Sequence, residues 1–210
     1  MAEIHTCIHP EEDCKRYADL LEKYPWTRRY WNYNGKPFEE ICGWFDPRLT
    51  CGEYPGWSRI FEKLCENIQQ ILDKYSIPSE QFVIRQVKEK FARIRMYWGF
   101  YELNAAGFPE KEIGRSGIAI DFLGHGTLSG FGSKSAEEDG YDPKYDEARI
   151  EIEKLLKEAA EESYITCIMC GSVEEIGYTK GWVLPVCTKC SESGLTNRVE
   201  YLKRFRTIWK

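Results

Sequence analysis

Four of the nine cysteines form two closely spaced pairs near the C-terminus, and this pattern limits the possible folds more than any other feature of the sequence. Two residues separate Cys167 from Cys170 and Cys187 from Cys190, with sixteen residues between the pairs. Such spacing lets a tight turn direct two sulfurs at one cation, and four soft thiolates in a tetrahedron suit Zn²⁺. The sequence therefore predicts that these cysteines bind zinc in a C-terminal zinc ribbon.

The predicted zinc ion has a structural role, because four cysteines leave no open coordination position for water or a substrate. Structural zinc contributes about 10 kcal/mol or more to the folding of small modules. The alternative is that the thiols are simply buried or form disulfides. Residues 1–12 contain three acids and lack the basic and apolar segments of a signal peptide. This favours a cytoplasmic protein, in which disulfides are rare.

A second metal site near the N-terminus is an open alternative. His5, Cys7 and His9 alternate, so an extended segment would present all three on one face, and Cys14 follows five residues later. Their spacing matches no zinc knuckle. The other interpretation is that the cysteines of this region pack as small hydrophobic side chains. The sequence does not decide between the two.

Apolar periodicity predicts two long helices. From Trp57 to Tyr75, apolar residues recur at intervals of three and four, which places them on one helical face, and Pro78 ends the helix. A second helix is predicted to begin at Asp142 and Pro143 and to run directly into the zinc ribbon.

Strands are predicted at Phe82–Val87, over residues 93–101, where apolar and polar residues alternate, and at Ile118–Phe122. The fold class is therefore α+β, with two long helices on a small antiparallel sheet and a C-terminal zinc ribbon. The apolar face of the sheet is expected to bury the helix that begins at Trp57. That face consists of Phe82, Ile84, Ile94, Met96, Trp98 and Phe100.

We predict three parts: an α+β domain over residues 1–165, the zinc ribbon over 166–192 and a basic tail over 193–210. The α+β domain includes an aromatic-rich N-terminal region, with a helix over 10–24, and an insertion over 102–140 whose role the sequence does not reveal. The chain is 42% hydrophobic, which is sufficient for a core. No apolar run is long enough to span a bilayer, so no membrane association is expected.

A catalytic set is difficult to assemble from this sequence. His125 is the one histidine beyond the first nine residues, and it lies in a stretch rich in glycine and serine that is predicted to be a loop over 124–135. The zinc-deaminase signature needs His-x-Glu and Pro-Cys-x-x-Cys, whereas Thr127 stands two residues after His125 and Val186 separates Pro185 from Cys187. The sequence therefore predicts that the protein is not an enzyme.

Nucleic-acid binding has mixed support. The net charge of −5 opposes a general attraction to polyanions. Basic and aromatic residues nevertheless share one side of the predicted hairpin or lie in the C-terminal tail, where they could contact a nucleic acid or another partner. An ordinary solvated sheet face and a tail that docks on acids of the same chain are the alternatives. The candidate contact residues are Arg85, Arg93, Arg95, Tyr97, Tyr101, Arg198, Lys203, Arg204 and Arg206.

Three stretches carry a resemblance to a known group of proteins. They are Pro55-Gly56-Trp57-Ser58, the run Gln-Val-Lys-Glu-Lys-Phe-Ala-Arg-Ile-Arg over 86–95, and the two cysteine pairs with Gly181-Trp182 between them. The chain resembles uncharacterised proteins of phages, prophages and other bacterial mobile elements over residues 20–100 and 145–192. It departs from their pattern at Ala92, where the group tends to have glycine, and in the insertion over 102–140.

The resemblance implies a bacterial-virus setting, and thus the cytoplasm of a bacterial host, but it transfers no catalytic residue. We therefore expect a non-enzymatic protein that binds a host protein. Inhibition of a host defence effector such as a CRISPR nuclease (an anti-CRISPR-like role) is the specific form of this hypothesis. The alternative is a nucleic-acid-binding zinc-ribbon protein that regulates phage transcription or replication. Neither the identity of the partner nor the oligomeric state follows from the sequence.

Overall fold

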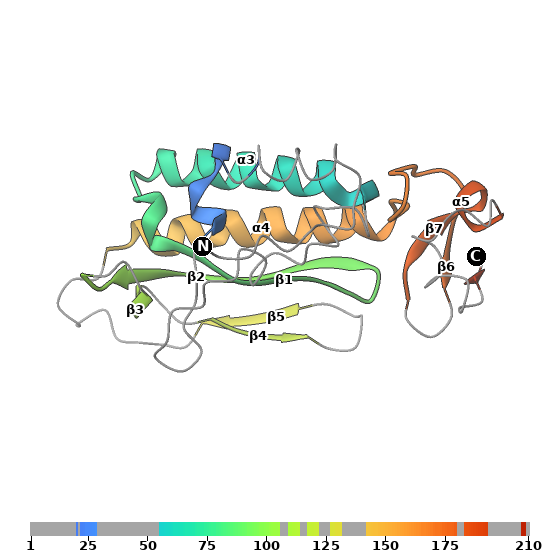
Figure 1. Ribbon diagram of the computed structural model, residues 1–210. Helices are drawn as coiled ribbons and strands as arrows, with labels where there is room; N and C mark the ends of the chain where they lie inside the picture. The colour runs from blue at the N-terminus through green and yellow to red at the C-terminus, as the bar shows by residue number, and fades with distance from the viewer. Residues whose placement is uncertain are drawn as a thin grey trace.

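The computed structural model describes residues 20, 22–28, 55–105, 109–113, 117–121, 127–131, 142–179, 183–192 and 207–208 (Figure 1). Most of the helix predicted over 10–24 lies outside these ranges, although residues 22 and 23 are helical and a 3-10 helix, η1, follows at Pro25–Arg28. The candidate second metal site also lies outside the described residues. It consists of His5, Cys7, His9 and Cys14.

Helix α3 (Ser58–Lys74) confirms the helix predicted from residue 57. It ends in a Schellman motif, and its last residue, Lys74, lies four residues before Pro78. Ser76 adopts a left-handed conformation with φ of 50°, and the backbone N–H of Ile77 donates to the carbonyl oxygen of Leu72 at 2.9 Å. The buried face of α3 follows the predicted periodicity. Its apolar residues are Ile60, Phe61, Leu64, Cys65, Ile68, Ile71 and Leu72.

The main sheet has three antiparallel strands in the order β1 (Phe82–Lys90), β2 (Arg93–Leu103) and β3 (Pro109–Ile113). Strand β1 extends three residues beyond the predicted end at Val87. The pairing of β1 with β2 shifts between Ile84 and Gln86, which inserts one residue into β1. The three residues beyond the predicted end are Lys88, Glu89 and Lys90, and a run of three charged residues carries no apolar alternation by which a strand is predicted.

A two-residue turn joins β1 to β2. Phe91 and Ala92 both have positive φ, 53° and 62°, as a type I′ hairpin turn requires. The carboxylate of Glu89 accepts the backbone N–H of Ala92 at 2.8 Å, and Glu89 is 5% exposed. This hydrogen bond to the turn explains why Glu89, a charged residue of β1, points into the core.

Replacing Ala92 with glycine is expected to raise the free energy of unfolding by about 1 kcal/mol, because glycine has no Cβ to oppose a left-handed backbone. Urea unfolding monitored by tryptophan fluorescence measures the change. The matched control is Ala160→Gly within the helix Lys144–Tyr164, which is expected to lower stability by about 1 kcal/mol. A lower stability for Ala92→Gly would contradict the role assigned to the turn.

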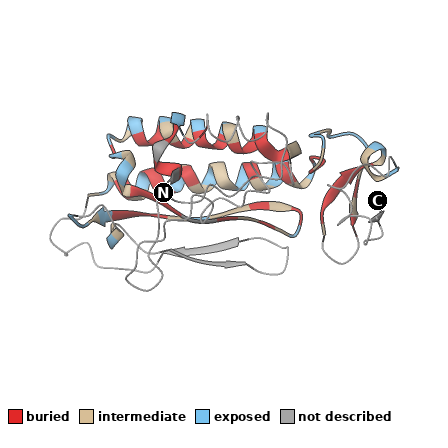
Figure 2. Ribbon diagram, in the orientation of Figure 1, coloured by how far each residue is buried: buried red, intermediate tan, exposed pale blue. Residues whose placement is uncertain are grey.

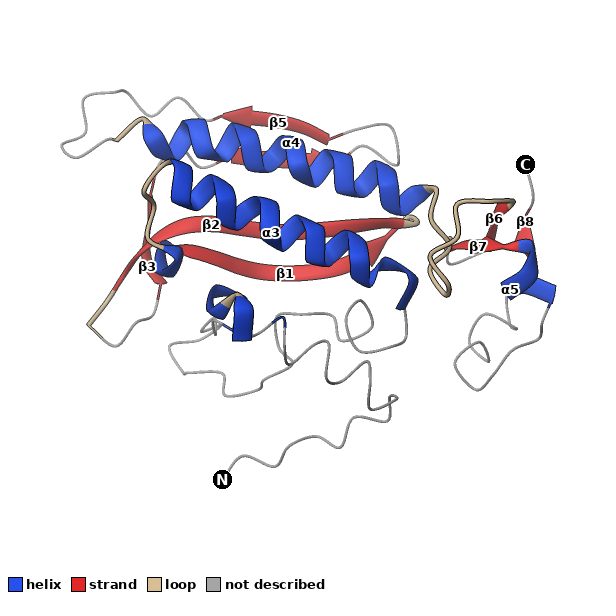
Figure 3. Ribbon diagram, turned by 90° about the horizontal axis from the view of Figure 1, so that it is seen from above, coloured by secondary structure: helices blue, strands red, loops and turns tan. Residues whose placement is uncertain are grey.

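Helix α4 (Lys144–Tyr164) confirms the second predicted helix. The side chain of Asp142 accepts the backbone N–H of Lys144 at 3.0 Å, and Pro143 occupies the N-cap position. Figures 1 and 3 show α3 and α4 side by side on one face of the sheet formed by β1 and β2. Buried positions concentrate between these layers (Figure 2). The predicted α+β fold class is therefore correct.

The predicted strand Ile118–Phe122 exists as β4 (Gly117–Asp121), but its predicted place in the main sheet is wrong. It pairs with β5 (Thr127–Phe131) in a separate two-stranded sheet. Strand β5 falls in a segment whose composition predicts a loop. The third strand of the main sheet is instead β3, which is mostly polar and begins with a proline. Such an edge strand carries little of the apolar alternation by which strands are predicted.

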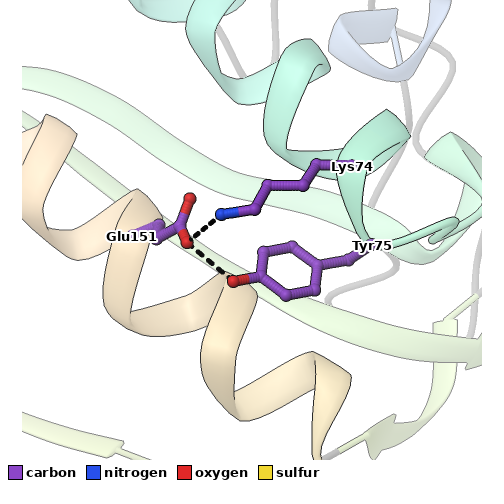
Figure 4. Close-up of polar contacts among 3 residues, drawn as sticks. All are labelled: Lys74, Tyr75 and Glu151. Carbon is purple, nitrogen blue, oxygen red and sulfur yellow. Dashed lines mark hydrogen bonds and ion pairs between the residues drawn. The ribbon is translucent and has the colours of Figure 1, made fainter.

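The two helices are also joined by a polar contact. One oxygen of the Glu151 carboxylate in α4 accepts hydrogen bonds from the Lys74 ammonium at 2.5 Å and from the Tyr75 hydroxyl at 2.6 Å (Figure 4). The hydrogen bond from Lys74, followed by that from Tyr75, lowers the pKa of Glu151. The same contacts raise the pKa values of Lys74 and Tyr75.

Replacing Glu151 with glutamine is expected to lower stability slightly at pH 7, because the contact is largely exposed to solvent. A carboxyl group whose pKa is lower in the folded state than in the unfolded state, where it is about 4.3, stabilises the folded protein above about pH 4.3. This contribution is lost as the pH falls through the folded-state pKa. The difference between the urea-unfolding midpoints of the parent protein and Glu151→Gln should therefore disappear below about pH 4. A gap that persists unchanged in acid would contradict the assignment.

Among the described residues, no helix combines the length and the apolar character needed to cross a membrane.

Candidate metal centre

The four predicted ligands come from two turns that the fold brings together. Cys167 and Cys170 lie in the turn that follows α4, Cys187 ends strand β7 (Pro185–Cys187), and Cys190 lies in the short helix α5 (Thr188–Glu192). We call the described part of residues 166–192 the cysteine module.

The four sulfur atoms form one cluster. All four Sγ atoms lie within 4.8 Å of one another, and those of Cys170 and Cys187 are 3.6 Å apart. A tetrahedral zinc site with Zn–S bonds of about 2.3 Å has sulfurs about 3.8 Å apart. The cysteines are free thiols rather than disulfides. They could therefore hold a metal ion at their centre.

The backbone of the first turn is shaped to present two sulfurs. The N–H of Cys167 donates to the carbonyl oxygen of Ser172 at 2.7 Å, and the N–H of Gly171 donates to that of Cys167 at 2.9 Å. Gly171 has a φ of 77°, a left-handed conformation that favours glycine. These bonds bring the chain back on itself directly after Cys170.

The pKa values of the clustered thiols Cys167, Cys170 and Cys190 are consistent with a bound cation. Burial raises the pKa of Cys167 to about 11, and burial with the nearby Cys167 raises the pKa of Cys190. Burial also opposes ionisation of Cys170, but hydrogen bonds from the Ser172 backbone and the neighbouring thiols outweigh it and lower the pKa of Cys170. Thiols this close repel one another when ionised, and a bound cation removes that repulsion.

The cysteine module packs directly on the Gly-Trp pair ahead of α3. The backbone N–H of Gly56, within the 3-10 helix η2 (Pro55–Trp57), donates to the carbonyl oxygen of Ile168 at 3.0 Å. A Cβ on Gly56 would lie 2.1 Å from the carbonyl oxygen of Cys167 and 2.5 Å from the nitrogen of Gly171. Only glycine permits this approach. This role of Gly56 could not be predicted from the sequence, because no local pattern shows which distant segment a glycine contacts.

Trp57 adds a second link between the same two regions. Its side chain is fully buried, and its indole N–H donates to the carbonyl oxygen of Thr166 at 3.0 Å, one residue before the first ligand. Gly56 and Trp57 together couple the start of α3 to the candidate metal centre.

An aromatic stack links the hairpin to the cysteine module. The Arg93 guanidinium in β2 lies 4.2 Å from the ring centre of Tyr164, at the end of α4. Tyr164 stacks in turn on Tyr178 of β6 (Ile176–Thr179), with ring centres 4.7 Å apart. The Tyr178 hydroxyl donates to the carbonyl oxygen of Tyr164 at 3.1 Å, and burial raises the pKa of Tyr178.

The cysteine module contains a small antiparallel sheet. Strand β7 begins at Pro185 and pairs with β6. The backbone of β8 (Thr207–Ile208) pairs with the other edge of β6. Trp182 lies outside the described residues.

The other predicted contact residues are placed differently from one another. Arg93 and Arg95 are half-buried, Tyr97 is 40% exposed, and Tyr101 is only 6% exposed. Tyr101 was expected on the solvated side of the sheet, but Gly99 and Phe100 are buried beside it, so this end of β2 is covered on both faces. The structure does not describe the side chains of several predicted contact residues or that of the loop histidine. They are Arg85, Arg198, Lys203, Arg204, Arg206 and His125.

Comparisons with protein-family models, with curated proteins and with solved structures found no match. The fold and the site define the chain as an α+β protein with a C-terminal cluster of four cysteines that could hold a metal ion.

Proposed function

We propose that this chain is a non-enzymatic binding protein whose cysteine module is stabilised by a structural Zn²⁺ ion. The observation that carries the proposal is the cluster of four sulfurs, whose spacing approaches that of a tetrahedral zinc site. Cys167, Cys170, Cys187 and Cys190 would hold the ion. Bound there, zinc would supply a cross-link rather than a reaction, because four protein ligands leave no position for water.

The first candidate partner is a protein of the bacterial host. Its most specific form is a host defence effector such as a CRISPR nuclease, which the chain would inhibit. The resemblance to proteins of phages and mobile elements supports this setting. Exposed apolar side chains support a protein contact: Phe91, Ile165 and Val173 are 44%, 53% and 63% exposed. They belong to the hairpin turn, the end of α4 and the cysteine module, which share one end of the molecule (Figures 1 and 3).

The second candidate partner is a nucleic acid, as for a regulator of phage transcription or replication. One observation favours it: the pairing of β1 with β2 sets Lys88 opposite Arg95 and Lys90 opposite Arg93. This pairing gathers four basic residues on one face of the hairpin, which supports an anionic partner.

Affinity purification from a bacterial lysate, with and without nuclease, separates the two candidates. The bait is the zinc-loaded protein, and mass spectrometry identifies what it retains. The first candidate predicts a stoichiometric host protein that survives nuclease and is lost with the double variant Ile165→Asp/Val173→Asp. Ile150→Asp is the matched control, because Ile150 is 58% exposed but lies within α4, away from the cysteine module. Retention of neither a protein nor a nucleic acid would contradict the proposed function.

A further inference from the structure

Two exposed aliphatic side chains flank the first cysteine turn. The backbone N–H of Cys167 donates to the carbonyl oxygen of Ser172 at 2.7 Å, which brings the chain back beside the end of α4. Ile165 lies two residues before this bonded pair and Val173 one residue after it, and they are 53% and 63% exposed. Exposed positions continue along the loop to β6 (Figure 2). Exposed apolar side chains that gather in one place mark an interaction surface.

The backbone that carries these two side chains is fixed at several points. Before the turn, the carbonyl oxygen of Thr166 accepts the buried Trp57 indole N–H at 3.0 Å. Within the turn, the carbonyl oxygen of Ile168 accepts a backbone N–H of η2 at 3.0 Å. After the turn, that of Glu175 accepts the backbone N–H of Thr188, from the second cysteine turn, at 3.2 Å. A partner therefore meets a preformed surface, so binding costs little conformational entropy.

Three carboxylates surround this apolar pair. Glu161 lies one helical turn before Ile165, and Glu174 and Glu175 directly follow Val173. All three glutamates are exposed, and none of their carboxylates makes a hydrogen bond or an ion pair in the part of the chain that the structure describes. Their charges are therefore available to a partner. We call Ile165, Val173, Glu161, Glu174 and Glu175 the acidic–apolar surface.

Few cations lie near these carboxylates. Residues 158–179 include five glutamates and no lysine or arginine. From other elements, the Lys63 ammonium pairs with the carboxylate of Glu162 at 3.5 Å, and the Arg93 guanidinium lies on the ring of Tyr164. Both cations thus have contacts of their own and leave the three glutamates of the acidic–apolar surface unpaired.

The neighbouring groups add negative rather than positive charge. Helix α4 has no basic residue in its last turn, and the C-terminal end of its dipole carries a partial negative charge. The described part of the cysteine module has three glutamates against one basic residue, Lys189. Zinc held by four thiolates would keep a net negative charge, so metal binding does not reverse the sign of this region.

We propose that the acidic–apolar surface docks a basic segment of a host protein, whose lysines or arginines pair with the three carboxylates while its apolar side chains cover Ile165 and Val173. This inference rests on the first candidate function, a protein partner. A nucleic acid would bring phosphates against carboxylates. A second copy docked about a two-fold axis would oppose the same glutamates to one another. A basic protein segment is the occupant whose charge fits.

Selection from a random peptide library tests the proposal. Peptides of about twelve residues, displayed on yeast, are selected against the zinc-loaded full chain. We expect the enriched peptides to combine lysine or arginine with at least one large apolar side chain. The most enriched peptide is then synthesised with a fluorescent label, and its dissociation constant is measured by anisotropy. We expect binding to weaken as salt rises, because exposed ion pairs are screened.

Two double variants separate the apolar from the acidic contribution. Ile165→Ala/Val173→Ala is expected to weaken binding of this peptide about tenfold at every salt concentration, because an apolar contact is lost. Glu174→Gln/Glu175→Gln is expected to weaken it about fivefold at low salt and little at high salt. Each variant should keep the metal content of the parent, which shows that the cysteine module is intact.

Glu66→Gln/Glu110→Gln is the matched control, because it removes two exposed carboxylates from α3 and β3, outside the acidic–apolar surface. It should bind the peptide normally. Weakening by this control equal to that of Glu174→Gln/Glu175→Gln would overturn the proposal, as would a selection that enriches acidic peptides or none.

Other occupants have their own signatures, and each of them would also overturn the proposal. Much tighter peptide binding by Arg204→Gln/Arg206→Gln would assign the surface to the basic tail of the same chain. A dimer that Ile165→Ala/Val173→Ala dissociates would assign it to a second copy.

The affinity purification separates this inference from the proposed function. A host protein that Glu174→Gln/Glu175→Gln retains as strongly as the parent, at low salt, would overturn the inference and leave the binding-protein proposal standing. A host protein lost with that variant but retained by Glu66→Gln/Glu110→Gln would support both.

Discussion

Replacing Cys170 with serine is expected to abolish tight metal binding and to unfold the cysteine module. Three remaining thiols cannot close a tetrahedral site, and structural zinc contributes about 10 kcal/mol or more to the folding of such modules. Cys170 is an exposed ligand, so the substitution removes little packing of its own. Metal analysis of the purified variant and loss of dispersed amide signals in an NMR spectrum measure the two effects.

Two further variants separate metal loss from general damage. Cys170→His keeps a zinc ligand and should recover part of the bound metal. Cys65→Ala removes a fully buried thiol from α3, far from the metal centre in the sequence, and should lower stability while the chain keeps its metal. If Cys170→Ser retained a full complement of metal, Cys170 would not be a ligand.

Replacing Gly56 with alanine is expected to cost about 3 kcal/mol or more in the free energy of unfolding. The new Cβ would meet the carbonyl oxygen of Cys167 at 2.1 Å and the nitrogen of Gly171 at 2.5 Å. Both atoms belong to the backbone of the first cysteine turn and cannot rotate away. The variant must either separate the turn from α3 or distort the metal site, so metal affinity should fall together with stability.

Urea unfolding and a competition titration with a zinc chelator measure the two losses for Gly56→Ala. Pro55→Ala, one residue earlier in the same segment, is the matched control and should change both quantities little. Equal behaviour of the two variants would show that the packing of Gly56 on the cysteine turn does not matter for the fold.

Local patterns in the sequence were sufficient for the strongest elements. The periodicity over 57–75 predicted α3, and Asp142 with Pro143 indicated the start of α4. Both signals are local, because the residues that form a helix face or a helix cap lie close together in the sequence. The spacing of the cysteine pairs was enough to predict the cluster of four sulfurs, since a metal site of this type is built from two local turns.

The parts that were not predicted depend on contacts between distant segments. Strand β3 is polar because it lies at the edge of the sheet, and β5 lies in a stretch whose glycines and serines suggested a loop. Lys88, Glu89 and Lys90 were not expected to belong to β1, because three consecutive charged residues carry no apolar alternation, and the contact of Glu89 with the turn is not visible in the sequence. The docking of Gly56 on the cysteine turn has no local signal at all.

Elemental analysis of the intact purified chain tests most directly whether the four cysteines bind one zinc ion. We predict one zinc per chain, and thiols at 167, 170, 187 and 190 that resist alkylation until a chelator removes the metal, after which all four react together. A chain that folds with a native cysteine module but contains no zinc, or whose four thiols react readily before chelation, would contradict this claim.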